Sequence, residues 1–558
     1  MTRARRLVRF AALAAATAVI LTNAYYLRLL EPAVSRARVA GAVLLACALA
    51  AAWTEWGLPR GRAQWREVAR QAAPAALLGG VLALAFGLRV WGITSGLPQS
   101  YVADEYDFVH AVLRMMKTGD LNPHSWYHPS LQPYLALATY TAVFLLEVPR
   151  GRWSHVHQIA EEDMLYWGRF TGVLAGTATV LVTYLVGRRL FGPRAGLLAA
   201  ALMAVFPAAV QHSQYNKPDP VLALMTTISV LVILVYLERG GTPLAFAAGA
   251  VIGLSLSAKY NGIVVVVPFL LAAAFRHGRR LLARPDLYAG AAGIVIGFAA
   301  GCPYFLSEFN LFLDHVADDI YTYAYAGRAG AEGVDNWAGH ATYTRKYGAG
   351  LAASLFALLG LGLVLYRMNA ALAVLVSFPI LYFGYYSTQR INYRPNLLPV
   401  YPFLALLAAH AFFELLRLAR ERVPARVLRV AAAVILIALL APPLRTAVLY
   451  NLEVTRRDTG NEARDWIARS FPPGTHFALE RHTPVLDRER FKVTQEARLI
   501  TRSVKSYRDE GVEYLVVSSM TFDRFDAGHN QTRSYQKLFA LCPLVQEFAP
   551  VPGRRPGP

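Results

Sequence analysis

Asp104, Glu105 and Asp107 form a cluster of carboxylates that follows an apolar segment at residues 73–91. Holding three carboxylates near hydrocarbon is costly, so their position at the end of a membrane helix indicates a polar site at the membrane surface. The chemistry open to such a group is acceptance of a proton from a hydroxyl, or binding of a cation. Which of these applies depends on the side of the membrane that the cluster faces and on its neighbours.

The elements that carry this cluster are those of a polytopic helical membrane protein. The 558 residues have a mean hydropathy of +0.34, and apolar stretches long enough to span a bilayer recur from residue 10 to residue 445. The net charge of +20 comes mostly from arginines in the short loops, which is typical of the positive-inside rule rather than of nucleic-acid binding. Three scattered cysteines predict neither a disulfide framework nor a metal cluster.

The arginine-rich loops give the expected orientation, because such loops stay in the cytoplasm. They lie at residues 61–70, 188–194, 276–284, 367 and 417–429. The N-terminus is then cytoplasmic and the C-terminus extracytoplasmic. The first apolar segment is interpreted as a retained helix rather than as a cleaved signal peptide. About 13 spans result, near residues 10–30, 37–57, 73–91, 168–187, 195–211, 219–237, 243–258, 260–275, 287–303, 350–366, 369–387, 396–416 and 428–445.

One apolar segment, Leu131–Leu146, does not fit this alternation. It is short, and prolines stand at positions 129 and 133. If it crossed the membrane, residues 188–194 and every later basic loop would lie outside. We therefore expect an interfacial or re-entrant helix within one long outer loop, residues 92–167.

The same orientation brings polar residues of the later connections to the outer face. They lie between spans and in a longer loop, rich in Tyr and Gly, at residues 304–347. The residues of interest are His128, Lys217, Asp219, Lys259, Arg390 and Arg394. Carboxylates and cations are therefore expected on one side of the membrane, together with Asp104 and Glu105.

The residues after the last span are polar and form a separate part of the chain. Thr459 and Glu462 have the spacing of a helix capping box, and His476–Leu479 and Tyr514–Val517 are typical of short buried strands. We expect a small extracytoplasmic α/β domain. The chain then consists of an N-terminal pair of spans with a cytoplasmic loop (1–72), a transmembrane domain (73–445) with outer loops 92–167 and 304–347, and a C-terminal domain (446–558).

Short motifs occur in a particular order along residues 73–415. They are Asp104-Glu105, Tyr127–Leu131, Gly168–Phe170, Gly187–Gly192, Lys217–Pro220, Ala258–Tyr260 and Arg394–Pro402. In this order they resemble the GT-C class of membrane glycosyltransferases, and most closely glycosyltransferase family 39. That family includes the protein O-mannosyltransferases and the aminoarabinose transferase that modifies lipid A.

The chain departs from the family pattern in two places. The segment Arg394–Pro402 is similar to the family motif R-Y-L-L-P-x-x-P, but it carries one extra residue. The resemblance therefore leaves open whether Arg390 or Arg394 holds the family's arginine role. In the first outer loop one proline, Pro129, stands where the family often has two.

The resemblance implies a GT-C fold and transfer of a sugar from a polyprenyl-phosphate donor to an extracytoplasmic hydroxyl on a lipid, a glycan or a protein. Phosphate is a good leaving group, so the reaction needs a base for the acceptor and cations for the departing phosphate. A single displacement places that base opposite the leaving group and gives inversion.

On this basis Asp104 is the base and Glu105 its neighbour, which orients it or holds a metal. The resemblance assigns Arg169, Lys259, Arg390 and Arg394 to the donor phosphate, and His128, Lys217 and Asp219 to the acceptor or to auxiliary roles. A divalent metal ion held by Asp104 and Asp219 is left open.

Each residue also has a structural interpretation. Asp104 or Glu105 could cap the following helix, Asp219 could mark a helix start, Arg169 could anchor a helix end, and Lys259 could form an ion pair. The alternative function is a transporter or flippase of lipid-linked sugars. Such proteins often have two related halves and a site near the midplane, and the sequence shows neither feature.

The expected partners are a polyprenyl-phosphate sugar, an extracytoplasmic acceptor and the bilayer. Nucleic acid is not among them. The composition, rich in Ala and Arg, predicts a bacterial plasma membrane as the location. The motifs determine neither the sugar nor the acceptor.

Overall fold

The computed structural model describes residues 62–98, 100, 102, 104–327, 336–391, 393–522 and 530–550, with side chains from residue 74 onward. The predicted spans near residues 10–30 and 37–57 lie outside these ranges. The chain divides into two compact units, Met1–Gly87 and Leu88–Pro558. Helix α3 (Arg62–Trp91) ends in the second unit, which contains all later elements.

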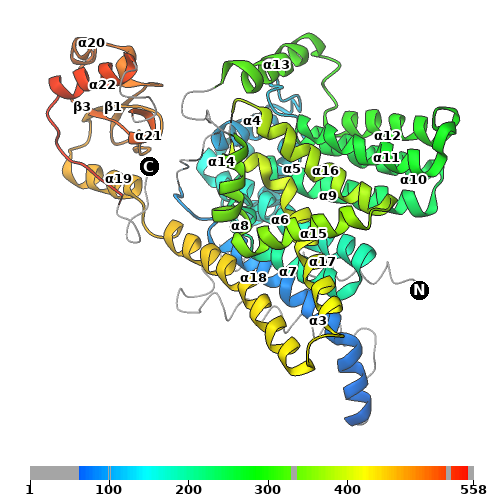
Figure 1. Cartoon of the computed structure of the whole chain (residues 1–558). Coiled ribbons are helices and arrows are strands. Elements are labelled where there is room, and N and C mark those ends of the chain that lie inside the picture. The colour runs from blue at the N-terminus through cyan, green and yellow to red at the C-terminus, as the bar shows by residue number, and fades with distance from the viewer. Residues whose placement is uncertain are drawn as a thin grey trace. The chain divides into compact units, whose positions relative to one another are not determined.

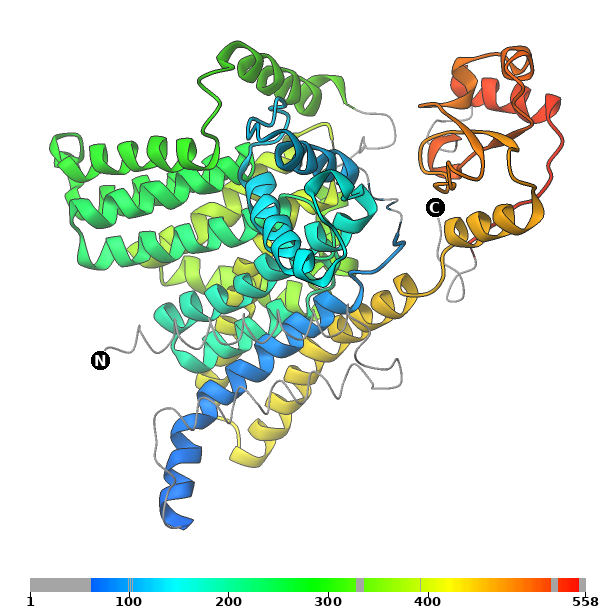
Figure 2. The ribbon, with the colours of Figure 1, turned by 180° about the vertical axis from the view of Figure 1, so that it is seen from behind.

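Long apolar helices dominate the described residues (Figures 1 and 2). Eight helical segments among these residues are long and apolar enough to cross a membrane, and four shorter apolar helices accompany them. The helices after α3 that carry predicted spans are α6 (Glu161–Phe191), α7 (Pro193–Val205), α8 (Pro207–His212), α9 (Asp219–Arg239), α10 (Thr242–Ala258), η3 (Tyr260–Val265), α11 (Val266–His277), α12 (Pro285–Gly301), α15 (Leu351–Tyr366), α16 (Ala370–Thr388), η7 (Arg394–Val400), α17 (Tyr401–Ala419) and α18 (Ala425–Val454). Every predicted span from residue 73 to residue 445 coincides with one or two helices, so the polytopic helical class is confirmed. The total of about 13 spans and their orientation stay predictions.

The segment that broke the predicted alternation is helix α5 (Leu131–Glu147). With the short η1 helix (Val148–Arg150) it reaches the length and hydropathy of a membrane span. Its polar residue Gln132 is fully buried and donates to the side chain of Asn216 at 3.0 Å. The interfacial placement of α5 stays a prediction that labelling can test.

The two predicted outer loops are themselves mostly helical. The first contains α4 (Glu105–Thr118), α5, η1 and η2 (Val156–Gln158), and the second contains α13 (Phe309–Tyr321), η5 (Thr322–Ala326), α14 (Asn336–Tyr343) and η6 (Thr344–Gly348). Helix α4 buries Phe108, Val109, Val112 and Leu113, whose spacing places them on one face. It ends at Gly119, which has the positive φ of 74° common after a helix C-terminus.

Helices α10 and α12 pack at very close range, and both views show them side by side. Gly249 and Gly253 of α10 lie against the backbone carbonyls of Gly290 and Ile294 of α12. Small residues that let two backbones approach are a common way to join helices in lipid, where apolar burial contributes little.

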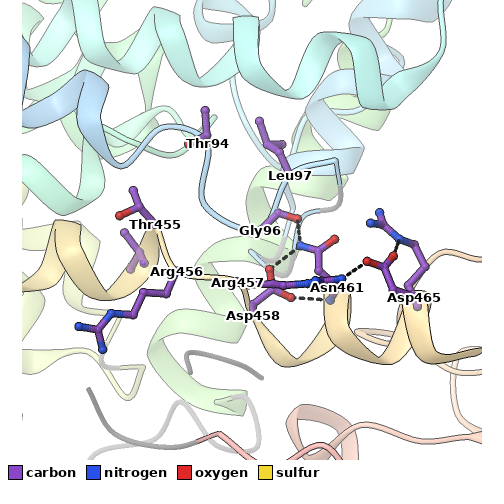
Figure 3. Close-up of a pocket in the computed structure, with 11 residues that line it drawn as sticks. Thr94, Gly96, Leu97, Thr455, Arg456, Arg457, Asp458, Asn461 and Asp465 are labelled. Carbon is purple, nitrogen blue, oxygen red and sulfur yellow. Dashed lines mark hydrogen bonds and ion pairs between the residues drawn. The ribbon is translucent and has the colours of Figure 1, made fainter. Parts of the chain in front are cut away.

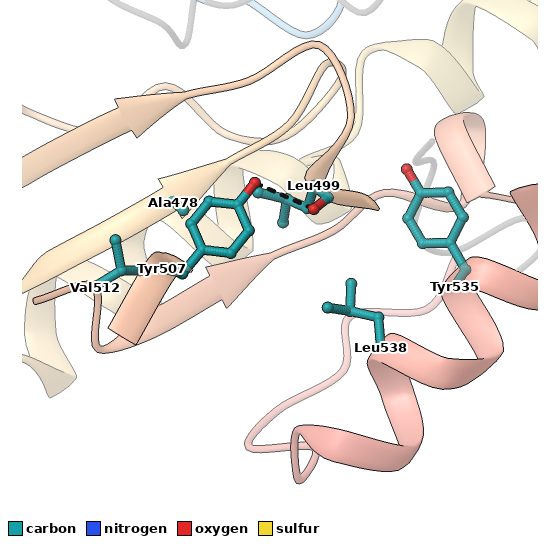
Figure 4. Close-up of a cluster of buried hydrophobic side chains, with 6 residues drawn as sticks. All are labelled: Ala478, Leu499, Tyr507, Val512, Tyr535 and Leu538. Atoms are coloured by element: carbon teal, nitrogen blue, oxygen red, sulfur yellow. Dashed lines mark hydrogen bonds between the residues drawn. The ribbon is translucent and has the colours of Figure 1, made fainter. Parts of the chain in front are cut away.

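The C-terminal part is a small α/β domain around a parallel sheet with the order β2-β1-β3. Its elements are α19 (Thr459–Ser470), β1 (His476–Leu479), β2 (Lys492–Gln495), η8 (Leu499–Thr501), α20 (Val504–Asp509), β3 (Tyr514–Val516), α21 (Ser519–Phe522) and α22 (Asn530–Leu541). Figure 4 shows one core cluster, in which Tyr507, Tyr535 and Leu538 pack with Ala478 of β1 and with Leu499. Both predicted strands are present.

Two features of this domain differ from expectation or extend it. Asp458, not Thr459, caps α19, because its side chain accepts the N–H of Asn461 at 2.8 Å. The predicted capping box was therefore wrong by one position. Glu480 at the end of β1 is fully buried and accepts hydrogen bonds from Tyr535 and from the backbone of Ser518. Burial raises the pKa of Glu480.

Candidate active site

Asp104 stands at the N-terminal end of α4 in a left-handed conformation, with a φ of 70°. This conformation is uncommon for residues other than glycine, and strained backbone concentrates at functional sites. The side chain makes no capping hydrogen bond, so the capping alternative is wrong for Asp104. It is about half exposed and accepts a hydrogen bond from Nζ of Lys217 at 3.3 Å. The fold therefore brings these two predicted site residues together.

Glu105 has the opposite environment, since it is fully buried. Its carboxylate accepts hydrogen bonds from Nε and Nη2 of Arg169 at 3.0 and 2.7 Å, and from the backbone N–H of Asn216 at 2.7 Å. Ser100 also donates to it. A buried carboxylate requires a cation and several hydrogen bonds, and Glu105 has both. Its oxygens are therefore engaged by the protein rather than by a metal or a substrate.

Arg169, which the motifs assign to the donor phosphate, lies in a buried ion pair with Glu105. Its side chain is 2% exposed, and Nη1 donates to the carbonyls of Ile93 and Ser95 at 2.9 and 2.6 Å. Each of its three nitrogens already has an acceptor. Arg169 instead joins helix α6 to the loop before α4, because burial demands that all its donors be satisfied within the protein.

Three glycines on α6 explain how Lys217 reaches Asp104. Gly168, Gly172 and Gly176 are four residues apart and so lie on one face of the helix. The segment Ser213–Asn216 lies on this face, and its atoms occupy the space that a β-carbon on any of the three would need. The close approach lets the backbone of Asn216 contact Glu105, and Lys217 follows directly.

Asp219 and Lys259 form a second ion pair where helices begin and end. Nζ of Lys259 donates to Oδ1 of Asp219 at 2.9 Å and to Oδ1 of Asn396 at 2.7 Å. Lys259 stands in extended backbone between α10 and η3, Asp219 opens α9, and Asn396 belongs to η7. The two side chains of the ion pair are 12% and 5% exposed. The ion-pair alternative for Lys259 is therefore present in the structure.

A metal role for Asp104 and Asp219 finds little support in these contacts. Each carboxylate already has a lysine partner. The residues that the structure describes contain no group of three or more His, Cys, Asp or Glu side chains arranged to hold a metal ion.

Arg390 and Arg394, the remaining predicted phosphate partners, are both exposed. The guanidinium of Arg394 lies over the ring of Tyr343, 5.4 Å from its centre. Arg390 donates to the carbonyl of Tyr325 at 2.7 Å, and its backbone N–H donates to the carbonyl of Tyr323. Arg394 therefore keeps its hydrogen-bond donors more available, whereas Arg390 ties the start of η7 to the second outer loop.

His128 stacks on Phe108 of α4, with the ring centres 5.4 Å apart. Burial, and then the positive charge of Lys259, lower the pKa of His128 to about 4, while Asp104 and Asp219 act in the opposite direction. His128 is therefore neutral at neutral pH. The charges that act on it show that it lies near both ion pairs of the site.

The segment before His128 is held by contacts that the sequence analysis did not anticipate. Glu308 accepts hydrogen bonds from Asn122 at 2.8 Å and from the indole of Trp126 at 3.0 Å. His124 lies between two carboxylates, with Nε2 2.7 Å from Oδ2 of Asp120 and Nδ1 2.5 Å from Oε1 of Glu308. These two hydrogen bonds raise the pKa of His124. The first outer loop is thus tied to the second, a pairing of distant residues that no local pattern indicates.

Arg89 and His212 are two further residues near the site that were not singled out. Arg89 is fully buried and donates to the carbonyls of Met203 and Ala204, both at 3.2 Å. These carbonyls are at the C-terminal end of α7, where Pro207 lacks the N–H that would continue the helical hydrogen bonds. His212 is buried and lies 3.2 Å from the hydroxyl of Tyr343. A charged residue inside an apolar span was the available signal for Arg89.

Comparison with known proteins gives a family match for part of the chain. A family model described as dolichyl-phosphate-mannose-protein mannosyltransferase matches residues 154–303, which include Arg169, Lys217, Asp219 and Lys259. No curated protein matches the chain.

Solved structures match over a longer region. The archaeal oligosaccharyltransferase AglB from Archaeoglobus fulgidus, in complex with an inhibitory peptide and a dolichol-phosphate, is 14% identical with a TM-score of 0.50. The match covers 74% of this chain but only 62% of the archaeal chain. ArnT from Cupriavidus metallidurans bound to undecaprenyl phosphate is 16% identical with a TM-score of 0.50, and the match covers 79% and 90% of the two chains. The shared feature is the fold, and the GT-C fold expected from the motifs is confirmed.

Proposed function

We propose that this chain, which has the GT-C glycosyltransferase fold, transfers a sugar from a polyprenyl-phosphate donor to an extracytoplasmic hydroxyl with inversion. The observation that carries the proposal is the environment of Asp104. It is an exposed carboxylate in strained backbone, paired with Lys217 and mounted on a buried polar framework. The two structural neighbours named above were solved with polyprenyl-type phosphates, which supports the donor class.

In the proposed reaction Asp104 is the base. The acceptor hydroxyl gives its proton to the carboxylate of Asp104 while its oxygen forms a bond to the anomeric carbon of the sugar. The bond from that carbon to the phosphate oxygen breaks on the opposite face, and the electron pair leaves with the phosphate. The products are the inverted glycoside, the polyprenyl phosphate and a protonated Asp104, which returns its proton to solvent.

The departing phosphate gains negative charge, so preorganised cations should lie near it. Arg394 is the strongest candidate, because its guanidinium is exposed, lies over Tyr343 and has no carboxylate partner among the residues that the structure describes. Lys259 and Arg390 stay candidates. Their existing contacts with Asp219 and with the carbonyl of Tyr325 mean that each would share its charge with the protein.

Glu105 and Arg169 have a different role in this proposal. They act through other residues, because their charged groups meet each other inside the protein. By holding the backbone of Asn216 and the start of α4, they place Lys217 against Asp104. Asp219 acts similarly on Lys259, and His128 supplies a neutral ring beside both ion pairs.

The experiment that tests the function compares bacterial membranes with and without the gene. Mass spectrometry of lipids, glycans and proteins should show one product that lacks a sugar in the deletion. Adding the purified chain and a polyprenyl-phosphate sugar to the deletion membranes should restore that product, and a nucleotide sugar should not. If the nucleotide sugar alone restores it, the donor class is wrong. If glycan composition is unchanged and only the leaflet of the lipid-linked sugar differs, the chain is a flippase.

A further inference from the structure

A cavity of about 440 Å³ lies where helix α18 gives way to α19 (Figure 3). The junction Val454–Asp465 forms one wall, and Thr94, Gly96 and Leu97 of the loop before α4 form the other. Its lining is mostly polar. By the predicted topology this junction lies on the outer side of the membrane, beyond the last span, where the end of α18 carries the cavity toward the lipid headgroups and the solvent.

Three arginines and two aspartates line this cavity. Arg464 donates to Asp465 at 3.0 Å, and Arg457 forms an ion pair with the same carboxylate, so one aspartate serves two arginines. Arg456 is exposed and has no ion pair or side-chain hydrogen bond among the described residues. Asp458 is engaged as the cap of α19. The cavity therefore keeps an uncompensated positive charge.

The N-terminus of α19 adds to this charge. Asp458 and Asn461, at the N-terminal end of this helix, line the cavity. The positive end of the helix dipole at this position favours an anion.

A second, independent observation concerns Asn461. It is 8% exposed, and its amide nitrogen donates to Asp458 at 2.6 Å and to the carbonyl of Gly96 at 3.4 Å, as Figure 3 shows. Its carbonyl oxygen Oδ1 is buried without a hydrogen-bond partner. Leaving a buried polar atom unpaired costs about 1–3 kcal/mol, so such an atom beside a cavity indicates a ligand that donates a hydrogen bond.

We propose that this cavity binds a phosphate that carries a hydroxylated group, such as the headgroup of phosphatidylglycerol. Arg456 contacts the phosphate, the dipole of α19 favours its charge, and a hydroxyl donates to Oδ1 of Asn461. A choline headgroup would make only the phosphate contact of this site, because it has no hydroxyl that could donate to Asn461. The residues that line the cavity do not include those assigned to transfer, so the proposal does not depend on the proposed reaction.

The test measures binding to the purified full chain in detergent by microscale thermophoresis. The probes are short-chain phosphatidylglycerol, short-chain phosphatidylcholine and glycerol 3-phosphate. We expect the glycerol lipid to bind more tightly than the choline lipid. If glycerol 3-phosphate binds as tightly as the lipid, the headgroup alone is the ligand. If only the lipid binds, the acyl chains contribute, and both results support the site.

The variants are chosen around Arg456, whose exposed side chain is not needed for folding. Arg456→Gln should weaken binding of the glycerol lipid about fivefold, the size of one exposed charge contact. Thr455→Asp, which places a carboxylate at the rim, should weaken it further. Arg469→Gln removes an exposed arginine of α19 that does not line the cavity, and should have no effect. Equal binding of the two lipids, or equal behaviour of Arg456→Gln and Arg469→Gln, would overturn the proposal.

Discussion

Asp104 and Glu105 are adjacent in the chain, yet their side chains occupy opposite environments. The carboxylate of Asp104 is 46% exposed and meets Lys217 at 3.3 Å, whereas that of Glu105 is 0% exposed and meets Arg169 at 2.7 Å. The backbone changes direction at Asp104, which has a positive φ. The two acidic residues of the pair thus lie in separate environments, one open to solvent and one enclosed by the protein.

The energetic consequences of the two pairs differ as well. Removing one partner of a buried pair leaves an uncompensated charge and costs about 3–5 kcal/mol, whereas an exposed pair contributes about 0–1 kcal/mol. The proposed mechanism therefore relies on the buried pair for stability, and on the exposed pair to exchange its partner during the reaction.

The largest effect is expected for Glu105→Gln. It leaves the guanidinium of Arg169 buried without a carboxylate, so the free energy of unfolding should fall by about 3–5 kcal/mol. Thermal unfolding in detergent, followed by tryptophan fluorescence, measures this change. The control is Glu161→Gln, an exposed carboxylate paired with His110, which should cost less than about 1 kcal/mol. Equal melting temperatures for both variants would remove the distinction between the two environments.

The next effect concerns pH and His128. Its pKa is about 4 in the folded protein and about 6.5 in an unfolded chain, so the unfolded chain takes up the proton first as pH falls. Stability from this residue is complete above pH 6.5 and is lost as pH falls toward 4, by at most about 1.4 kcal/mol per pH unit. His128→Gln should flatten the pH dependence of the melting temperature in this window. His155→Gln, in an exposed position of the same loop, is the control. An unchanged slope in His128→Gln would contradict the assigned environment.

A smaller effect is expected for Lys217→Gln. Because the pair with Asp104 is exposed, stability should change by less than about 1 kcal/mol, and turnover should fall by about fivefold or less. Steady-state transfer assays and melting curves separate the two quantities. A loss of stability as large as that of Glu105→Gln would mean that Lys217 belongs to the buried framework.

The last prediction is qualitative and concerns the side of the membrane. Cysteines introduced at positions 104, 217 and 341, which the structure leaves at least partly exposed, should react with an impermeant thiol reagent in intact cells, and those at 62 and 278 only after permeabilisation. The interfacial placement of α5 requires positions 104 and 217 to react from the same side. Labelling of these two positions from opposite sides would make α5 a span.

Much of the fold could be predicted because a bilayer imposes simple requirements on the sequence. A span needs a long apolar segment, and basic loops are expected in the cytoplasm. Each span, such as α9 or α16, can therefore be predicted from its own segment of the sequence. Strand β2 was missed, since Lys492–Gln495 has neither an apolar run nor clear alternation. The cap of α19 was misplaced because Asp458 and Thr459 are both good capping residues, and only geometry chooses between them.

The candidate site was predictable as a set of residues but not as a set of pairs. Asp104, Lys217, Asp219, Lys259 and His128 do lie near one another. That Arg169 binds Glu105 rather than phosphate follows from the fit of residues 213–216 on α6, which no local pattern reveals.

The central claim is that Asp104 is the base and Glu105 is structural, and one comparison of variants tests it most directly. Asp104→Asn keeps the size of the side chain but not its ability to accept a proton. Turnover with a polyprenyl-phosphate sugar should fall about 10²–10⁴-fold, with the melting temperature and the donor affinity unchanged. Near-normal turnover of Asp104→Asn in a folded protein would contradict the claim and place the base elsewhere.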